Sequence, residues 1–200
     1  MRDKVIVFVT GSPGTGKTYL ASKIIENFPQ MQLISYDAIK EEYWDKYGFS
    51  SIDEKRKLDN WSLEFFYTQI EEKMVREEGI ITDYPLYQRH RERLKGMVSD
   101  HAYKALTVLL YGDKDVIYAR AMRRDSGRRH PGHFMEIYHK NDNTKSVHDK
   151  PKTKAQFWDE IKDKNYDIGL GKTIMIDVTE FDNVNYKKLY EIIEKLVNSE

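Results

Sequence analysis

The strongest chemical signal in the sequence is a glycine-rich run near the N-terminus. It reads Gly11-Ser12-Pro13-Gly14-Thr15-Gly16-Lys17-Thr18 and matches the phosphate-binding pattern G-x-x-x-x-G-K-[ST] at every fixed position. Glycines let backbone N–H groups turn toward phosphate oxygens without a Cβ in the way. Lys17 adds a point charge for the β- and γ-phosphates, and the hydroxyl of Thr18 is a ligand for Mg²⁺. The run therefore predicts that the chain binds a nucleoside triphosphate, which we take to be ATP, together with Mg²⁺.

A glycine turn of this kind can also arise by chance, and the neighbouring residues decide between the two interpretations. The apolar segment Val5–Val9 precedes the run and is typical of a strand buried on both faces of a parallel sheet. Residues 17–28 follow with apolar side chains at helical spacing. A helix that begins there directs the positive end of its dipole at the same phosphates. The strand–loop–helix order favours a phosphate-binding loop, called the P loop below.

Three aspartates follow apolar segments and are candidates for work on a phosphoryl group. Asp37 comes after the short segment Leu33–Ser35, where it can accept a hydrogen bond from an acceptor hydroxyl and orient it for attack. It also precedes a helix expected to start at Ala38, so a capping role is the alternative. Asp83 and Asp177 each end a segment that reads as a strand, and either is a candidate ligand for Mg²⁺.

A basic stretch follows the fourth expected strand. Arg120, Arg124 and Arg128 are spaced i, i+4, i+8 and share one face if the helix continues that far. Residues 120–154 hold five Arg and five Lys against four Asp and Glu, in a chain with net charge zero. Guanidinium groups suit phosphate oxygens and neutralise charge on a migrating phosphoryl group. The alternative is that this stretch is a helix end whose charged side chains simply face solvent.

Two smaller groups of residues leave their roles open. His130 and His133 suggest a metal site, but the chain lacks cysteine and the spacing matches no usual metal pattern, so substrate contact and solvation remain. Arg89 and Arg93 fall on one face of a basic helix expected over residues 87–98. They would suit an anionic acceptor, or would simply face solvent.

The elements that must position these residues alternate along the chain. Short apolar segments that read as strands are separated by helical segments, which indicates a five-stranded parallel sheet with helices on both faces. Residues 38–78 are helical with a break near Gly48, and an apolar stripe in that region is expected to face the core. The members of the stripe are Trp61, Phe65, Ile70 and Met74.

Length and composition set the outer limits. The chain has 200 residues and is expected to form one domain over 1–200. Thirty-three basic and 33 acidic residues argue against a generally basic nucleic-acid coat protein. The absence of cysteine excludes a thiol nucleophile and thiolate metal sites. No apolar run approaches the roughly 20 residues that cross a membrane, so a cytoplasmic protein is expected.

These motifs together resemble the small P-loop kinases, in the branch that holds zeta toxins, polynucleotide 5′-hydroxyl kinases and antibiotic phosphotransferases. The resemblance is specific at Gly11–Thr18 and weaker at Asp37, Asp83 and Arg120–Arg124. It implies a three-layer fold with strand order 2-3-1-4-5, a base at Asp37 and a mobile arginine lid over about 120–154. In that order the strand beside the P-loop strand is the third, so Asp83 rather than Asp177 is the expected Mg²⁺ ligand. Asp83 could alternatively contact the acceptor or cap a turn before Pro85.

The function expected from this resemblance is transfer of the γ-phosphate of Mg·ATP to a hydroxyl group. Lys17, Asp37, Arg120 and Arg124 are the expected catalytic residues, and Arg128 is expected to help bind ATP. A P-loop switch or motor that acts on a macromolecular partner is the main alternative. A nucleotide-binding module without catalysis is another. The sequence does not name the acceptor, and it leaves open whether the acceptor is anionic or a nucleic acid.

Overall fold

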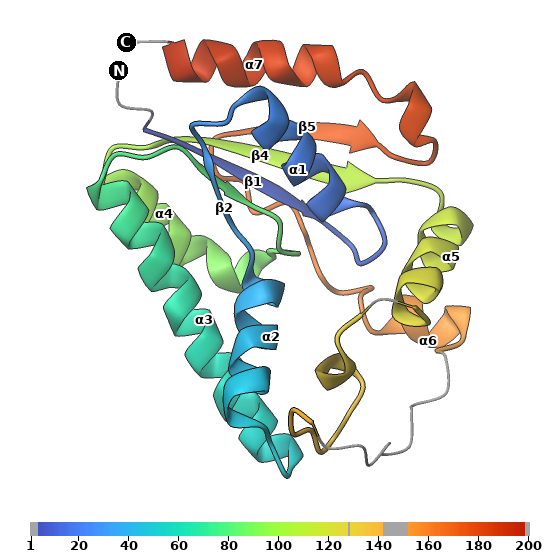
Figure 1. The fold of residues 1–200 in the computed structure, drawn as a ribbon. Helices are drawn as coiled ribbons and strands as arrows, with labels where there is room; N and C mark the ends of the chain where they lie inside the picture. The colour runs from blue at the N-terminus through green and yellow to red at the C-terminus, as the bar shows by residue number, and fades with distance from the viewer. Residues whose placement is uncertain (1–3, 128, 142–151, 199–200) are drawn as a thin grey trace.

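A central sheet of five parallel strands organises the molecule in this computed structural model, which describes residues 4–127, 129–141 and 152–198 (Figure 1). The strand order is β2-β3-β1-β4-β5, as expected. The strands are β1 (Val5–Gly11), β2 (Gln32–Ile34), β3 (Ile80–Thr82), β4 (Lys104–Tyr111) and β5 (Lys172–Asp177). Because all run parallel, their carboxyl ends meet at one edge, where the loops that follow them can share a ligand.

Helices cover both faces of the sheet. They are α1 (Lys17–Asn27), α2 (Tyr36–Tyr47), α3 (Ile52–Val75), α4 (Arg91–Asp100), α5 (Lys114–Asp125), α6 (Lys154–Asp159) and α7 (Tyr186–Asn198). Short 3₁₀ turns lie at Gln88–His90, Pro131–His133 and Phe181–Asn183. Figure 1 shows α1 and α7 over one face and α3 and α4 over the other. In the described ranges every helix is too short or too polar to cross a bilayer.

Alternation along β1 explains the two layers of core. Val5, Val7 and Val9 pack with apolar residues of α1 and α7, whereas Ile6 and Phe8 pack with those of α3 and α4. All seven residues of β1 are buried, which fits the continuous apolar run in the sequence.

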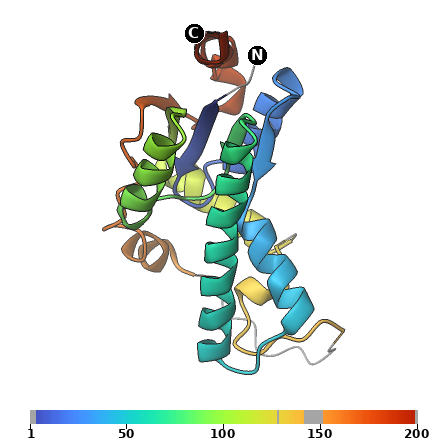
Figure 2. The ribbon, with the colours of Figure 1, turned by 90° about the vertical axis from the view of Figure 1, so that its left-hand side faces the viewer.

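The pair α2–α3 projects beyond the carboxyl edge of the sheet (Figure 2). Gly48 ends α2 with φ 63°, a left-handed value that glycine adopts at little cost, and Ser51 caps α3 by accepting a hydrogen bond from Glu54 N. Trp44, Phe49 and Leu58 form a separate small core there. The projection therefore has packing of its own and can hold side chains away from the sheet.

The apolar stripe expected within residues 38–78 lies on α3, and only two of its four residues are buried as expected. Ile70 and Met74 are buried, but Trp61 is 57% exposed and Phe65 is 38% exposed. Phe66 and Tyr67 are buried in their place. The buried face of α3 therefore includes Phe66 and Tyr67 in place of Phe65, because it is the face that packs with the strands, whereas Trp61 and Phe65 lie at the rim against Tyr47 and Tyr43 of α2.

Replacing Ile6 by Ala tests the core under the site. Ile6 is fully buried in β1, so Ile6→Ala should lower the free energy of unfolding by about 2–5 kcal/mol through lost burial and a cavity. The matched control is Ile52→Ala, because Ile52 is 44% exposed at the start of α3 and its loss should change stability by no more than about 0.5 kcal/mol. Urea unfolding measures both. Equal losses in the two variants would contradict this assignment of the core.

Candidate active site at the carboxyl edge of the sheet

The P loop connects β1 to α1 in the expected strand–loop–helix order. Gly11, Gly14 and Gly16 all have positive φ values, of 138°, 92° and 83°. A Cβ at Gly14 would lie 2.4 Å from the carbonyl oxygen of Ile117, so only glycine fits against α5 at this point. The N-terminus of α1 has no side-chain cap and no acidic residue in its first turn. Its backbone N–H groups are thus available to an anion.

Lys17 lies inside the P loop. Its Nζ donates hydrogen bonds to the carbonyl oxygens of Gly11 at 3.0 Å and Ser12 at 2.9 Å. Burial lowers the pKa of Lys17 to about 8, although Asp37 and Asp83 oppose that shift. The ammonium group is therefore held at the centre of the loop, where a phosphate oxygen would meet it.

Thr18 and Asp83 lie side by side. The Thr18 hydroxyl donates to Asp83 Oδ2 at 2.7 Å, and burial raises the pKa of Asp83 even though this hydrogen bond opposes the shift. Asp83 follows β3, which pairs directly with β1, so its position beside the P loop agrees with the sequence-based expectation. Asp177 ends β5, two strands from β1, where its Oδ1 accepts from Thr179 N.

The chemistry of this pair fits Mg²⁺. A hydroxyl and a carboxylate supply oxygen ligands to a hard cation, and Mg²⁺ binds through one or two such groups while it keeps waters and phosphate oxygens. The part of the chain that the structure describes contains no cluster of three His, Asp or Glu side chains able to hold a metal alone. Thr18 and Asp83 are therefore suited to an ion that arrives with a nucleotide.

Asp37 lies in the first turn of α2, not at its cap. The helix begins at Tyr36 and its N-cap is Ser35, so the capping role considered for Asp37 is wrong. Burial alone would raise the pKa of Asp37, but Lys40 at 3.2 Å, His133 and Arg129 together hold it below its usual value. With its side chain 41% exposed, Asp37 is an ionised carboxylate that a ligand can reach.

The arginine segment differs from the expected continuous helix. Helix α5 ends at Asp125, so the face shared by Arg120 and Arg124 does not extend through residue 128. Arg128 itself lies outside the described residues. Both terminal nitrogens of Arg120 donate to the carbonyl oxygens of Val178 and Thr179, so that Arg120 ties α5 to the loop after β5.

Arg124 and Arg129 share one carboxylate. The Nε and Nη2 of Arg124 lie 2.8 and 2.7 Å from Asp125 Oδ1, and Arg129 Nη1 lies 3.0 Å from the same oxygen. Both arginines oppose protonation of Lys17, which shows that they are within electrostatic reach of the P loop. Arg129 is thus part of the cationic group, although it lies outside the i, i+4, i+8 spacing of Arg120, Arg124 and Arg128.

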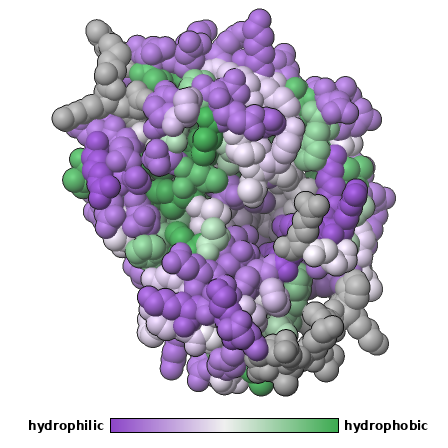
Figure 3. Space-filling view, viewed as in Figure 1, coloured by the Kyte–Doolittle hydropathy of each residue, from purple (hydrophilic) through white to green (hydrophobic). Residues whose placement is uncertain are grey.

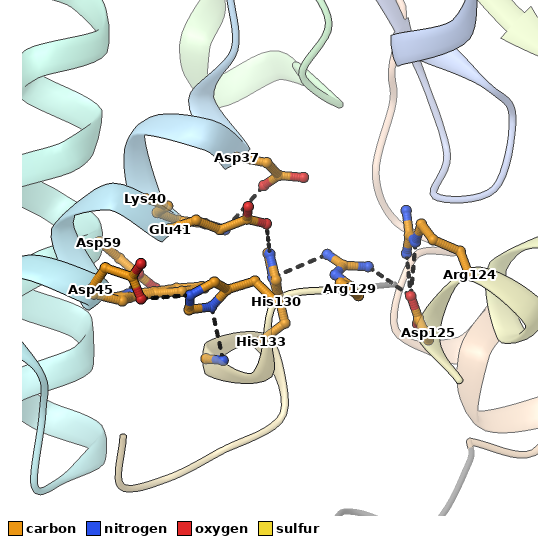
Figure 4. A network of polar contacts seen from close by, with 12 residues as sticks. Asp37, Lys40, Glu41, Asp45, Asp59, Arg124, Asp125, Arg129, His130 and His133 are labelled. Atoms are coloured by element: carbon orange, nitrogen blue, oxygen red, sulfur yellow. Dashed lines mark hydrogen bonds and ion pairs between the residues drawn. The ribbon is translucent and has the colours of Figure 1, made fainter. Parts of the chain in front are cut away.

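A neutral histidine links Arg129 to α2 (Figure 4). Arg129 Nη2 lies 3.1 Å from His133 Nδ1, and His133 Nε2 lies 2.8 Å from Glu41 Oε1. Because a guanidinium can only donate, Nδ1 accepts, and Nε2 carries the proton that is donated to Glu41. Burial lowers the pKa of His133 to about 4, so this imidazole is neutral at pH 7.

A second histidine fixes the same segment farther along α2. Gly132 N donates to His130 Nδ1, so His130 Nε2 donates to Asp45 Oδ1 at 3.0 Å. Tyr138 also donates to Asp45, and Lys140 pairs with its other oxygen at 2.7 Å. These partners hold the pKa of Asp45 well below its usual range.

A sequence signal for this docking exists on α2. Asp37, Glu41 and Asp45 follow at i, i+4, i+8 and form an acidic stripe, and the basic segment binds its members Glu41 and Asp45. His133 and His130 are hydrogen-bonded to carboxylates of that stripe, so these bonds account for both histidines without a metal ion. Figure 3 shows a hollow in the middle of this face, below the P loop and between α2 and α5.

Comparisons with known proteins agree with this geometry. The family model described as AAA domain matches residues 6–140, more than half of the chain. No curated protein sequence matches. Among solved structures, a protein of Chloroflexus aurantiacus provisionally named a kinase has TM-score 0.76 and 20% identity, covering 97% of this chain and 98% of that one.

Two more solved structures share the fold at lower similarity. The gluconokinase from Sinorhizobium meliloti has TM-score 0.54 and 16% identity over 98% of this chain and 91% of that one. Kti12 from Chaetomium thermophilum, solved in complex with ADP-AlF3, has TM-score 0.63 and 14% identity over 97% and 100%. These similarities and the strand order confirm the expected three-layer fold of the P-loop kinases.

The neutral state of His133 predicts a pH effect. Its pKa in the folded chain is about 4 against an ordinary 6.5, so between these values the unfolded chain binds a proton that the folded chain does not. Stability should therefore fall as pH drops from 6.5 to 4. In His133→Gln the slope of unfolding free energy against pH between 4 and 6.5 should be shallower than in the wild type. Identical slopes in the two proteins would show that His133 is not buried neutral.

Proposed function

The chain belongs to the AAA domain family, and we propose that within it the chain is a kinase that transfers the γ-phosphoryl group of ATP to a hydroxyl group. The observation that supports this most directly is an ionised, partly exposed Asp37 within electrostatic reach of Lys17 in the P loop. A switch or motor has no need of a reachable carboxylate at this point, whereas transfer to an alcohol does.

Each residue of the site has a role in such a transfer. The P-loop N–H groups and Lys17 hold the β- and γ-phosphates, while Asp37 orients the acceptor hydroxyl and takes its proton as the new P–O bond forms and the bond to ADP breaks. Thr18 and Asp83 would hold Mg²⁺, which when bound neutralises charge on the phosphate oxygens.

The arginines supply the remaining positive charge. Arg124 and Arg129 are kept together by Asp125, within electrostatic reach of Lys17. Negative charge that shifts onto the leaving oxygen in the transition state is best stabilised by such fixed cations. Arg129 also reaches α2 through His133, so a continuous series of contacts joins the arginines to the helix that carries Asp37.

Turnover of ATP with and without acceptors distinguishes the kinase from the switch. A kinase is nearly idle alone and transfers labelled phosphate to one class of hydroxyl compound among sugars, sugar acids, nucleosides, oligonucleotides and antibiotics. Release of inorganic phosphate that rises only with a macromolecule, and with no labelled product, would favour the switch.

Substituting Asp37 tests the proposed base. Asp37→Asn keeps the size and polarity of the side chain but removes its charge, so kcat for transfer should fall by roughly 10²–10⁴ while ATP affinity changes little. Asp53→Asn is the matched control, because Asp53 is exposed in the first turn of α3 and pairs only with nearby Arg56 among the described residues. An Asp37→Asn variant with wild-type kcat would eliminate the base.

Substituting Asp83 tests the metal site. Asp83→Asn should raise the Mg²⁺ concentration needed for half-maximal activity by roughly 10–100-fold, since a charged ligand is replaced by a neutral one. Asp177→Asn makes the same change at the end of β5 and should leave this concentration unaltered. Activity is measured against Mg²⁺ at saturating ATP. A shift of similar size in both variants would contradict the assignment of Asp83.

A further inference from the structure

Three arginines follow β3, and the structure separates them. Arg93 Nη1 pairs with Glu64 Oε1 at 2.7 Å, and Arg91 Nη1 pairs with Glu92 Oε1 at 2.7 Å. Arg89 has no carboxylate partner among the described residues. The sequence left open whether Arg89 and Arg93 bind an anionic acceptor or face solvent, and of the two only Arg89 keeps its charge free of a carboxylate in the described residues.

Arg89 is nevertheless held in place. Its Nε donates to His90 Nε2 at 3.2 Å, and the buried His90 donates from Nδ1 to the Tyr67 hydroxyl at 2.8 Å. Burial lowers the pKa of His90 to about 4, so the imidazole is neutral and able to accept this bond. The guanidinium lies 4.8 Å from the centre of the Tyr87 ring. One nitrogen is thus anchored, while within the described ranges both terminal nitrogens have no partner and can bind an anion as a fork.

A wall of rings connects Arg89 to the proposed base. The rings of His90 and Tyr84 are 5.8 Å apart, and those of Tyr84 and Tyr36 are 4.5 Å apart, both edge to face. Tyr36 directly precedes Asp37 in α2. Besides burial, which raises the pKa of Tyr84, Asp37 raises it and Arg89 lowers it, so this phenol lies within reach of both charges.

The arrangement has a positive group at one end, a negative group at the other and aromatic rings between them. Resting on the proposed kinase, we propose that the phosphate acceptor is an anion whose phosphate or carboxylate group is bound by Arg89 while its hydroxyl is bound by Asp37. The partly buried ring of Tyr84 contacts the carbon skeleton between the two groups, and the buried ring of Tyr36 packs behind it. A neutral acceptor would leave the anchored guanidinium of Arg89 without an anionic partner.

Direct anion binding tests the Arg89 site without knowledge of the acceptor. The P loop is first filled with Mg²⁺ and a non-hydrolysable ATP analogue, so that the anion cannot bind there. Inorganic phosphate and acetate are then titrated separately, at constant ionic strength set with chloride, and followed by NMR of the folded protein. At least one should bind saturably, with Kd at least about tenfold higher in Arg89→Gln and unchanged in Arg93→Gln. Absent binding, or equal Kd values in the two variants, overturns the proposal.

Transfer assays then separate the chemical classes. Gluconate is compared with glucose, and adenosine 3′-monophosphate with adenosine, so that each pair offers a hydroxyl with and without an anion. An anionic member should be preferred, and its KM should rise about 10–100-fold in Arg89→Gln while the KM for ATP stays constant. A response in the gluconate and glucose pair indicates that Arg89 binds a carboxylate, and a response in the adenosine pair indicates that it binds a phosphate.

The two proposals fail in different ways. If the neutral compounds are phosphorylated as well as the anionic ones and Arg89→Gln changes neither KM, the chain is a kinase and the anionic class is wrong. If Arg89-dependent anion binding is found but ATP turnover responds only to a macromolecule, the anion site stands and the kinase proposal fails.

Discussion

The burial of β1 on both of its faces is the constraint on which the rest of the site depends. The strand is fixed by β3 on one side and β4 on the other, with Val7 aligned to Ile81 and to Leu106. Because β1 is paired on both sides, the start of the P loop is fixed in place. This lowers the further conformational entropy that is lost when Gly11, Gly14 and Gly16 are held at positive φ. The same pairing brings the end of β3 beside the loop, and so places Asp83 against Thr18.

Charge is arranged so that an anion completes the site. Lys17, Arg124 and Arg129 are mutually unfavourable, and the pKa values of Lys17 and Arg124 are lowered first by burial and further by the neighbouring cations. Two separate carboxylates among the described side chains offset this positive charge. Asp125 lies below the arginines, and Asp37 lies across the hollow from them. A bound triphosphate would relieve this repulsion, which is how a site gains affinity for a highly charged ligand without a net positive chain.

The sequence was sufficient for features that depend on local pattern and not for those made between distant segments. The P loop, the five strands and the position of Asp83 follow from motif, periodicity and family resemblance. The contact of His133 with Glu41 joins residues 92 positions apart, and no spacing rule announces it. The sequence did not reveal that Arg129 joins Arg124 at Asp125 for a different reason. That grouping depends on α5 ending at Asp125, which the sequence pattern did not predict. Trp61 and Phe65 were expected in the core but lie at its rim, because helical periodicity does not say which apolar residues of a long helix pack with the sheet.

The backbone pairing of Phe49 with Tyr138 joins the tip of α2–α3 to the segment that carries Arg129. With the contacts of His130 and His133, it ties Arg129 to the helix that carries Asp37, so that a displacement of α2 would carry both residues. In the proposed kinase, an acceptor that fits poorly against α2 would move Asp37 away from its hydroxyl and Arg129 away from the phosphates together. Choice of acceptor and suppression of ATP hydrolysis would then depend on one movement of the protein.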